Sequence, residues 1–151
     1  MVANKAYYLT ITVTDWVDVF TRPAYRHIMV NSLKHCIEGK GLVLHAWVLM
    51  SNHLHLLANG QEDVWLPGVL RDMKKFTSKT ITTNIEQIPE SRREWMLHRF
   101  AFAGKQDKKI EKYKFWQDGN EPKEVFGHEF MMQKLDYIHL NPVRAEYVAE
   151  P

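Results

Sequence analysis

Two strand-like segments separated by only two residues constrain the fold of this chain more than any other feature. Residues 41–50 read GLVLHAWVLM, residues 53–58 read HLHLLA, and Ser51-Asn52 between them is a turn signal. Apolar and β-branched residues of this kind favour strands. So short a connection can join two strands only as an antiparallel hairpin. The other elements of the fold must therefore be arranged around this hairpin.

The segments on either side of the hairpin show further strand and helix patterns. Residues 6–14 alternate apolar and threonine side chains, which predicts a strand. Apolar residues spaced by three and four predict a helix that is capped by Thr21, has Pro23 in its first turn and ends at Gly39. The remaining expected elements are helices at 66–88, 90–102 and 128–140 and a strand at 113–117.

The resulting order, β-α-β-β-α-(α)-β-α, favours one fold class. This class is α+β, with a ferredoxin-like split β-α-β antiparallel sheet and an additional C-terminal helix. With 151 residues, 45% of them apolar and 25% charged, the chain has the composition of one globular domain spanning 1–151. The segment 90–114 has no clear place in this fold.

Composition also narrows the function classes. Cys36 is the only cysteine, which excludes an intramolecular disulfide and a CxxC zinc site. The first 14 residues lack the apolar core of a signal peptide, and no apolar run approaches the roughly 18 residues of a membrane span. We therefore expect a cytoplasmic protein. The net charge of +2 permits a nucleic-acid partner without arguing for one.

A histidine pair opens the second strand of the hairpin. Residues i and i+2 of a strand point to the same face, so His53 and His55 project together while Leu54 points to the other side. Two adjacent imidazoles can chelate a divalent metal ion. Two ordinary surface histidines beside a hairpin would give the same pattern, so the pair alone does not establish a site.

The last predicted helix carries a second candidate constellation. Tyr137 and Asn141 are spaced i and i+4 and share one face, with Lys134 one turn earlier. Met131 and Leu135 belong to an apolar stripe on the opposite side. An amphipathic helix that only packs its apolar side explains the same residues.

Taken together, the two constellations match the chemistry of covalent phosphodiester cleavage. Such a reaction needs a nucleophilic oxygen, a cation that neutralises the phosphate oxygens and a geometry that holds both in line. The phenolate of Tyr137 could supply the nucleophile, and a metal held by the histidine pair and a third ligand could supply the cation. Lys134 is a candidate electrostatic or proton-relay helper of the phenolate.

The strand motif His53-Leu54-His55 and the late helix motif YIHLNPVRA at 137–145 resemble those of the single-tyrosine HUH transposases. Within these, the chain is most similar to the REP-associated tyrosine transposase-like group. The similarity also takes in segments 7–13, 46–50 and 115–117 and so covers nearly the whole chain. The histidine pair is weakly specific, and the YIHLNPVRA motif is much more so.

This resemblance implies a DNA strand transferase with an HUH endonuclease fold that is a homodimer. It would cleave and rejoin single-stranded DNA at hairpin-bearing ends without ATP. Tyr137 would attack the scissile phosphate, form a 5′-phosphotyrosine link and release a 3′-OH. His53 and His55 would bind Mg²⁺ or Mn²⁺, and Asn141 matches the position of the family's third ligand.

Basic and aromatic residues provide a candidate DNA-binding surface. Lysines on the 66–88 helix and in the 104–114 segment could contact phosphates, which gives salt-dependent binding. A solvated helix face explains the helix lysines equally well. Trp65, in a polar loop, is the candidate for stacking on an unpaired base. The candidate lysines are Lys74, Lys75, Lys79, Lys105, Lys108 and Lys109.

Two other functions stay open. A non-cleaving module derived from a transposase could bind hairpin or single-stranded DNA, although the intact histidine pair, Tyr137 and Asn141 argue against it. A metal-dependent hydrolase could use His53 and His55 to activate water. Such a hydrolase would not need Tyr137, so a variant at this position separates it from a transferase.

Overall fold

A four-stranded antiparallel sheet forms the centre of the computed structural model, which describes residues 5–110, 112–125, 129 and 131–136. The strands lie in the order β2-β3-β1-β4, so that β1 pairs with both β3 and β4. This is the expected split β-α-β arrangement, and the predicted fold class is confirmed. The strands are β1 (Tyr7–Thr12), β2 (Leu42–Leu49), β3 (His53–Gly60) and β4 (Lys123–Glu124).

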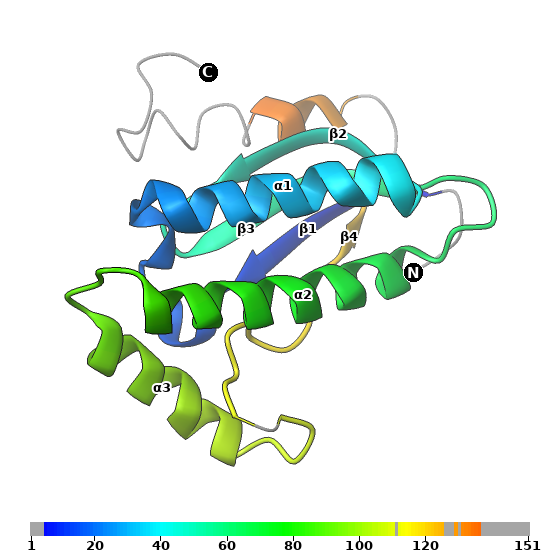
Figure 1. Ribbon diagram of the computed structural model, residues 1–151. Coiled ribbons are helices and arrows are strands. Elements are labelled where there is room, and N and C mark those ends of the chain that lie inside the picture. The colour runs from blue at the N-terminus through cyan, green and yellow to red at the C-terminus, as the bar shows by residue number, and fades with distance from the viewer. Residues whose placement is uncertain (1–4, 111, 126–128, 130, 137–151) are drawn as a thin grey trace.

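Two long helices cover one face of the sheet (Figure 1). They are α1 (Pro23–Gly39) and α2 (Leu66–Gln87), both near their predicted positions. A third helix, α3 (Arg93–Lys105), packs against α2 and against the short 3-10 turn η1 (Thr14–Trp16). A second such turn, η2 (Val19–Thr21), leads into α1.

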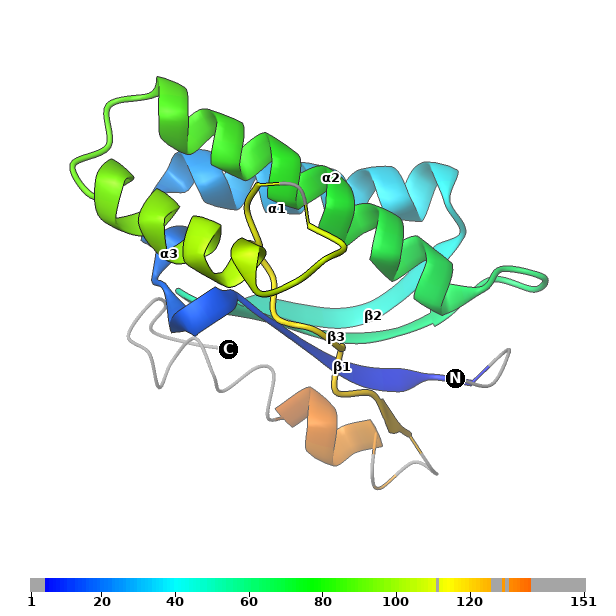
Figure 2. The ribbon, with the colours of Figure 1, turned by 90° about the horizontal axis from the view of Figure 1, so that it is seen from below.

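Residues 131–136 are helical, as expected, and lie on the opposite face of the sheet from α1 and α2 (Figure 2). Two hydrophobic clusters match these two layers. The larger lies under α1 and α2 and includes Leu54 and Leu56. The smaller lies on the other face, where Met131 and Leu135 pack against buried residues of the sheet, among them Leu57. The alternation of β3 side chains thus separates the core from the face that carries the histidines.

The predicted strand at 113–117 is wrong. The fourth strand is Lys123–Glu124, and within 113–117 only Trp116 forms an isolated bridge, with Val13. Trp116 is buried, stacks on Phe20 and donates a hydrogen bond from Nε1 to Thr77 Oγ1 at 3.0 Å. The aromatic side chains of this segment, whose pattern resembles that of a strand, therefore belong to the hydrophobic core.

Thr21 is not the cap of α1. The residue before the helix is Arg22, and Pro23 occupies the first turn, as predicted. The Thr21 hydroxyl instead donates to the carbonyl of Asp18 at 3.2 Å. Proline already removes one of the backbone donors that a capping side chain would satisfy. Within the part of the chain described above, no helix is both long and apolar enough to cross a membrane.

Candidate functional site

The histidine pair lies at the start of β3, on the face of the sheet away from α1 and α2. His53 is opposite Thr12 of β1, and His55 is opposite Thr10. The two imidazole rings are 4.6 Å apart between centroids, with an angle of 80° between their planes. The predicted projection of both rings to one side is confirmed, and the rings are close enough to share one ion.

Hydrogen bonds at Nδ1 orient both rings. His53 Nδ1 donates to Asn52 Oδ1 at 2.7 Å, which leaves Nε2 as the nitrogen with the lone pair. His55 Nδ1 is 2.9 Å from the Tyr8 hydroxyl and 3.2 Å from the Thr10 hydroxyl. Metal-ligating histidines are commonly held in this way by a hydrogen bond at the other ring nitrogen.

The surroundings also keep the pair uncharged. Burial, together with the nearby charges of His53 and Lys134, lowers the pKa of His55 to about 4. Burial lowers the pKa of His53 as well, and the charge of Glu121 opposes this shift. Neutral imidazole is the form that binds metals. Two neutral, adjacent and oriented imidazoles therefore fit a divalent cation.

A third ligand is not found among the described residues. They contain no group of three or more His, Cys, Asp or Glu side chains that could hold a metal ion. The predicted third ligand Asn141 and the predicted nucleophile Tyr137 both lie outside the described residues. These two assignments stay predictions.

The helical residues 131–136 lie against the histidine face. Lys134 Nζ is 4.9 Å from the centroid of the Tyr8 ring. Tyr8 in turn stacks on His55, with 5.4 Å between ring centroids. Lys134 also contributes to the lowered pKa of His55, so its charge is felt at the site. Lys134 precedes Tyr137 by three residues in the sequence.

Lys74, one of the lysines predicted from the sequence to contact DNA, is bound within the protein. Its ammonium group donates to the carbonyl oxygens of Gln117 and Gly119 and to Asn120 Oδ1, at 3.1–3.3 Å. These bonds hold the segment that leads into β4. Burial lowers the pKa of Lys74, and Asp118 raises it. The sequence pattern missed this role because the partners are more than 40 residues away.

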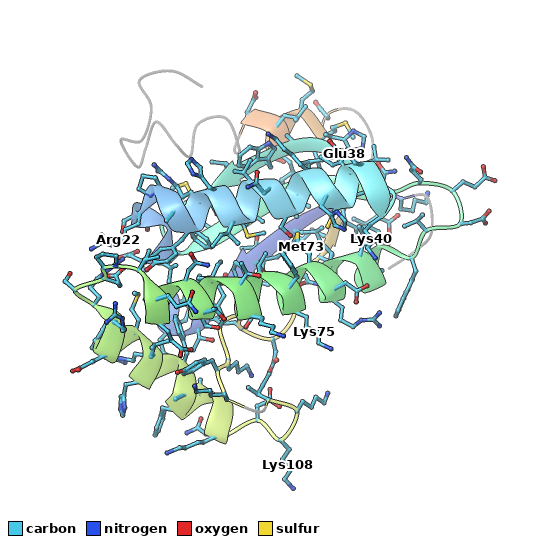
Figure 3. The ribbon with its side chains drawn as sticks, viewed as in Figure 1. Arg22, Glu38, Lys40, Met73, Lys75 and Lys108 are labelled. Carbon is cyan, nitrogen blue, oxygen red and sulfur yellow. The ribbon has the colours of Figure 1, made fainter. Side chains whose placement is uncertain are left out.

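The other candidate lysines lie apart from the histidine pair. Lys75 and Lys79 line a groove of about 640 Å³ between α1 and α2, on the helix side of the molecule seen in Figure 3. Lys105, Lys108 and Lys109 are exposed at the end of α3 and in the loop after it. The structure therefore leaves these five lysines available to a partner without bringing them to the histidines.

Trp65 is exposed but lies far from the histidine pair. It immediately precedes α2, and Arg71 lies 5.9 Å from the centroid of its ring. The chain reaches it just after Gly60, at the opposite end of β3 from His53. Eight strand residues separate these ends by roughly 23 Å. Any base that stacks on Trp65 would be remote from the histidine pair.

Sequence reasoning missed three residues that support the pair: Tyr8, Thr10 and Asn52. The alternation of residues 6–14 does place Tyr8 and Thr10 on one face. Only the pairing of β1 with β3 shows that this face is the one with His55. The alternation of residues 6–14 was therefore visible in the sequence, but its meaning for the site depends on the order of the strands in the sheet.

Comparisons with known proteins agree with this architecture. Residues 2–114 match the family model described as "Transposase IS200 like", a match that includes the histidine pair. A comparison with curated proteins gave no match. Among solved structures, the chain is similar to a REP-associated tyrosine transposase bound to a REP hairpin. The TM-score is 0.61 at 15% identity, over 98% of this chain and 72% of that one.

A second similar structure is a Deinococcus radiodurans R1 protein assigned as a transposase. Its TM-score is 0.54 at 14% identity, over 91% of each chain. The split β-α-β sheet thus has the HUH-type fold of these structures, and the two histidines lie on its face away from α1 and α2. Since the family match covers most of its length, the chain belongs to the IS200-like transposase family.

Proposed function

We propose that this protein is a metal-dependent transposase that cleaves and rejoins single-stranded DNA through a 5′-phosphotyrosine intermediate. One observation carries the proposal. Two neutral, hydrogen-bonded imidazoles, His53 and His55, lie on the same face of the sheet as Lys134, which precedes Tyr137 by three residues in the sequence. The similar REP-associated transposase is bound to a hairpin, which supports a hairpin-bearing DNA as the substrate.

The histidine pair would hold Mg²⁺ or Mn²⁺, with Asn141 as the third ligand. Such an ion withdraws charge from the phosphate oxygens and positions the scissile group. His53 and His55 can take this part at neutral pH because burial disfavours the protonated form of both. Asn52, Tyr8 and Thr10 hold the rings in place, so little reorganisation is needed on binding.

Tyr137 would supply the nucleophile. Its phenol loses a proton, and the phenol oxygen forms the new bond to phosphorus while the bond from phosphorus to the 3′ oxygen breaks. The 3′ oxygen takes up one proton in exchange and leaves as a hydroxyl. The ammonium group of Lys134 favours the ionised phenol and offsets negative charge at the phosphate. The same steps in reverse, with another 3′-OH, rejoin the strand without an external energy source.

The test uses a labelled hairpin oligonucleotide taken from the DNA that flanks the gene. Protein and oligonucleotide are incubated with Mn²⁺ and separated on a denaturing gel. We expect a heat-stable protein–DNA band with the wild type and with the matched control Tyr113→Phe. Tyr137→Phe, His53→Ala and added chelator should each remove the band.

Each alternative outcome has a defined meaning. A covalent band that persists in Tyr137→Phe overturns the assignment of the nucleophile. Full activity with chelator present overturns the metal site. Specific hairpin binding without any covalent band in the wild type would favour a non-cleaving DNA-binding module.

A further inference from the structure

Exposed aromatic side chains gather at the end of the molecule where β3 begins. We use the name aromatic stripe for Trp16 in η1 and Trp95, Arg99 and Phe102 on α3. Trp16, Trp95 and Phe102 expose 64%, 49% and 57% of their surface. Trp and Phe are normally buried when a helix has an inner face available. Here Met96 and Phe100 occupy the inner face of α3, and the stripe faces solvent.

The backbone of η1 holds Trp16 outward. Asp15 and Trp16 have φ angles of 56° and 52°, in the left-handed region that bulky residues rarely adopt. The turn is closed by a hydrogen bond from the Trp16 amide to the Val13 carbonyl at 3.0 Å. Such conformations persist where the surrounding structure fixes them, and they concentrate at functional sites.

Asn52 connects this turn to the histidine pair. Its Nδ2 donates to the Trp16 carbonyl at 3.2 Å, and its Oδ1 accepts from His53 Nδ1 at 2.7 Å. One side chain therefore bridges the turn that presents Trp16 and a proposed metal ligand. A nucleic-acid strand that leaves the histidine face at this end of the sheet would meet Trp16 first.

The part of the stripe on α3 continues from the same turn. Trp95, Arg99 and Phe102 are spaced i, i+4 and i+7, so they share one helix face. The Arg99 guanidinium lies 5.4 Å from the centroid of the Trp95 ring, and its Nη1 is 3.8 Å from Asp15 Oδ2. The segment 92–105 carries four basic residues and one acidic residue. Arg92 is paired with Glu90, and Arg93 donates to the backbone carbonyls of Ile85 and Ile88. The stripe thus combines ring faces with the half-exposed guanidinium of Arg99.

We propose that the aromatic stripe binds the unpaired nucleotides next to the proposed cleavage site. Bases would stack on Trp16 and Trp95, and Arg99 would contact the phosphate between them. Aromatic platforms combined with positive charge are typical of single-strand binding. A protein partner would match the apolar rings but would not supply the phosphate that the guanidinium of Arg99 can bind. This inference rests on the proposed function, and it gives α3 a role that the sequence left unassigned.

The test measures binding separately from cleavage. Fluorescence anisotropy with chelator present gives the Kd for two oligonucleotides, a blunt hairpin and the same hairpin with a single-stranded flank. Trp16→Ala and Trp95→Ala should each weaken binding of the flanked hairpin by about 5- to 100-fold, the usual range for one stacked base, and leave the blunt hairpin unchanged. Trp47→Ala and Phe76→Ala, which truncate exposed aromatic residues on β2 and α2, are the matched controls.

Arg99→Gln supplies a second measurement in case a tryptophan variant fails to fold. It should reduce the slope of log Kd against log salt by about one for the flanked hairpin only. Unchanged Kd values in the tryptophan variants, or an equal loss on both oligonucleotides, would overturn the proposal. Because binding is measured without metal, loss of the covalent band and loss of flank binding can be told apart.

Discussion

A buried carboxylate fixes the position of α3, and removing its charge should destabilise the protein by a predictable amount. Glu90 Oε1 is 2.9 Å from Arg22 Nε and 3.1 Å from Arg92 Nη2, and it accepts a hydrogen bond from the Tyr25 hydroxyl at 3.1 Å. Glu90 Oε2 accepts from the Arg92 backbone amide at 2.9 Å. These contacts join the start of α1 to the start of α3.

The magnitude follows from the pKa of Glu90. Burial disfavours its charged form, but the hydrogen bonds from Arg92 and Tyr25 outweigh burial and hold the pKa at about 2, against an ordinary value of 4.5. A shift of this size corresponds to roughly 3 kcal/mol at neutral pH. Because the Arg22 and Arg92 side chains remain 41% and 28% exposed, water screens part of this. We expect a loss of about 2–3 kcal/mol for Glu90→Gln, or a Tm lower by about 5–10 °C.

The assay is urea unfolding of the wild type and Glu90→Gln at pH 7 and pH 3, with the exposed Glu94→Gln as the matched control. A carboxyl group whose pKa is lowered by folding stabilises the folded protein fully at pH values above its unfolded-state pKa. This stabilisation is lost as the pH falls through its folded-state pKa. The difference between wild type and Glu90→Gln should therefore shrink to about half at pH 3. An equal difference in the free energy of unfolding at both pH values would show that the variant acts through altered packing and not through the lost charge.

Two further predictions concern single side chains. His55 should titrate near pH 4 by NMR. The free energy of unfolding should therefore fall as the pH drops from about 6.5 towards 4, because in this range the imidazole of the unfolded chain binds a proton and that of the folded protein does not. Titration near 6.5 would contradict the burial of the His55 imidazole. Lys74→Met should lower the free energy of unfolding by about 1.5–3 kcal/mol in urea, because it removes charged hydrogen bonds to Gln117 and Gly119. The exposed Lys75→Met is its control, and equal unfolding of the two variants would show that those bonds contribute nothing.

Local patterns predicted the hairpin and its histidine pair well because their partners are close in the sequence. Alternation in β3 fixed the shared direction of His53 and His55 before any tertiary contact was known. Trp116 could not be placed in this way. Its aromatic neighbours satisfy a strand pattern, while its hydrogen bond to Thr77 and its stacking on Phe20 join segments far apart in the chain.

The lysines predicted to contact DNA show the same limit of local sequence patterns. Sequence grouped Lys74 with Lys75 and Lys79 because all three lie on one helix and carry the same charge. Residues 75 and 79 are one turn apart and do share the groove between α1 and α2. Lys74 is rotated by about 100° from Lys75, which turns it towards the loop before β4. A count of charges cannot distinguish these two faces of α2. Only the packing of the loop before β4 against α2 shows what Lys74 contacts.

The register of β3 determines the chemistry of the candidate site as well as the stability of the core. A shift of one residue would exchange the two faces of this strand, so that Leu54 would replace the histidines on the face away from α1 and α2 and a histidine would enter the core under these helices. The hairpin prevents this shift by pairing Leu49 with Leu54 and by a hydrogen bond from the Met50 amide to the His53 carbonyl at 2.8 Å. Leu54 and Leu56 are fully buried, and a shifted register would remove them from the core under α1 and α2, which raises the free energy of that register. The same leucines that stabilise the sheet therefore keep the two imidazoles side by side.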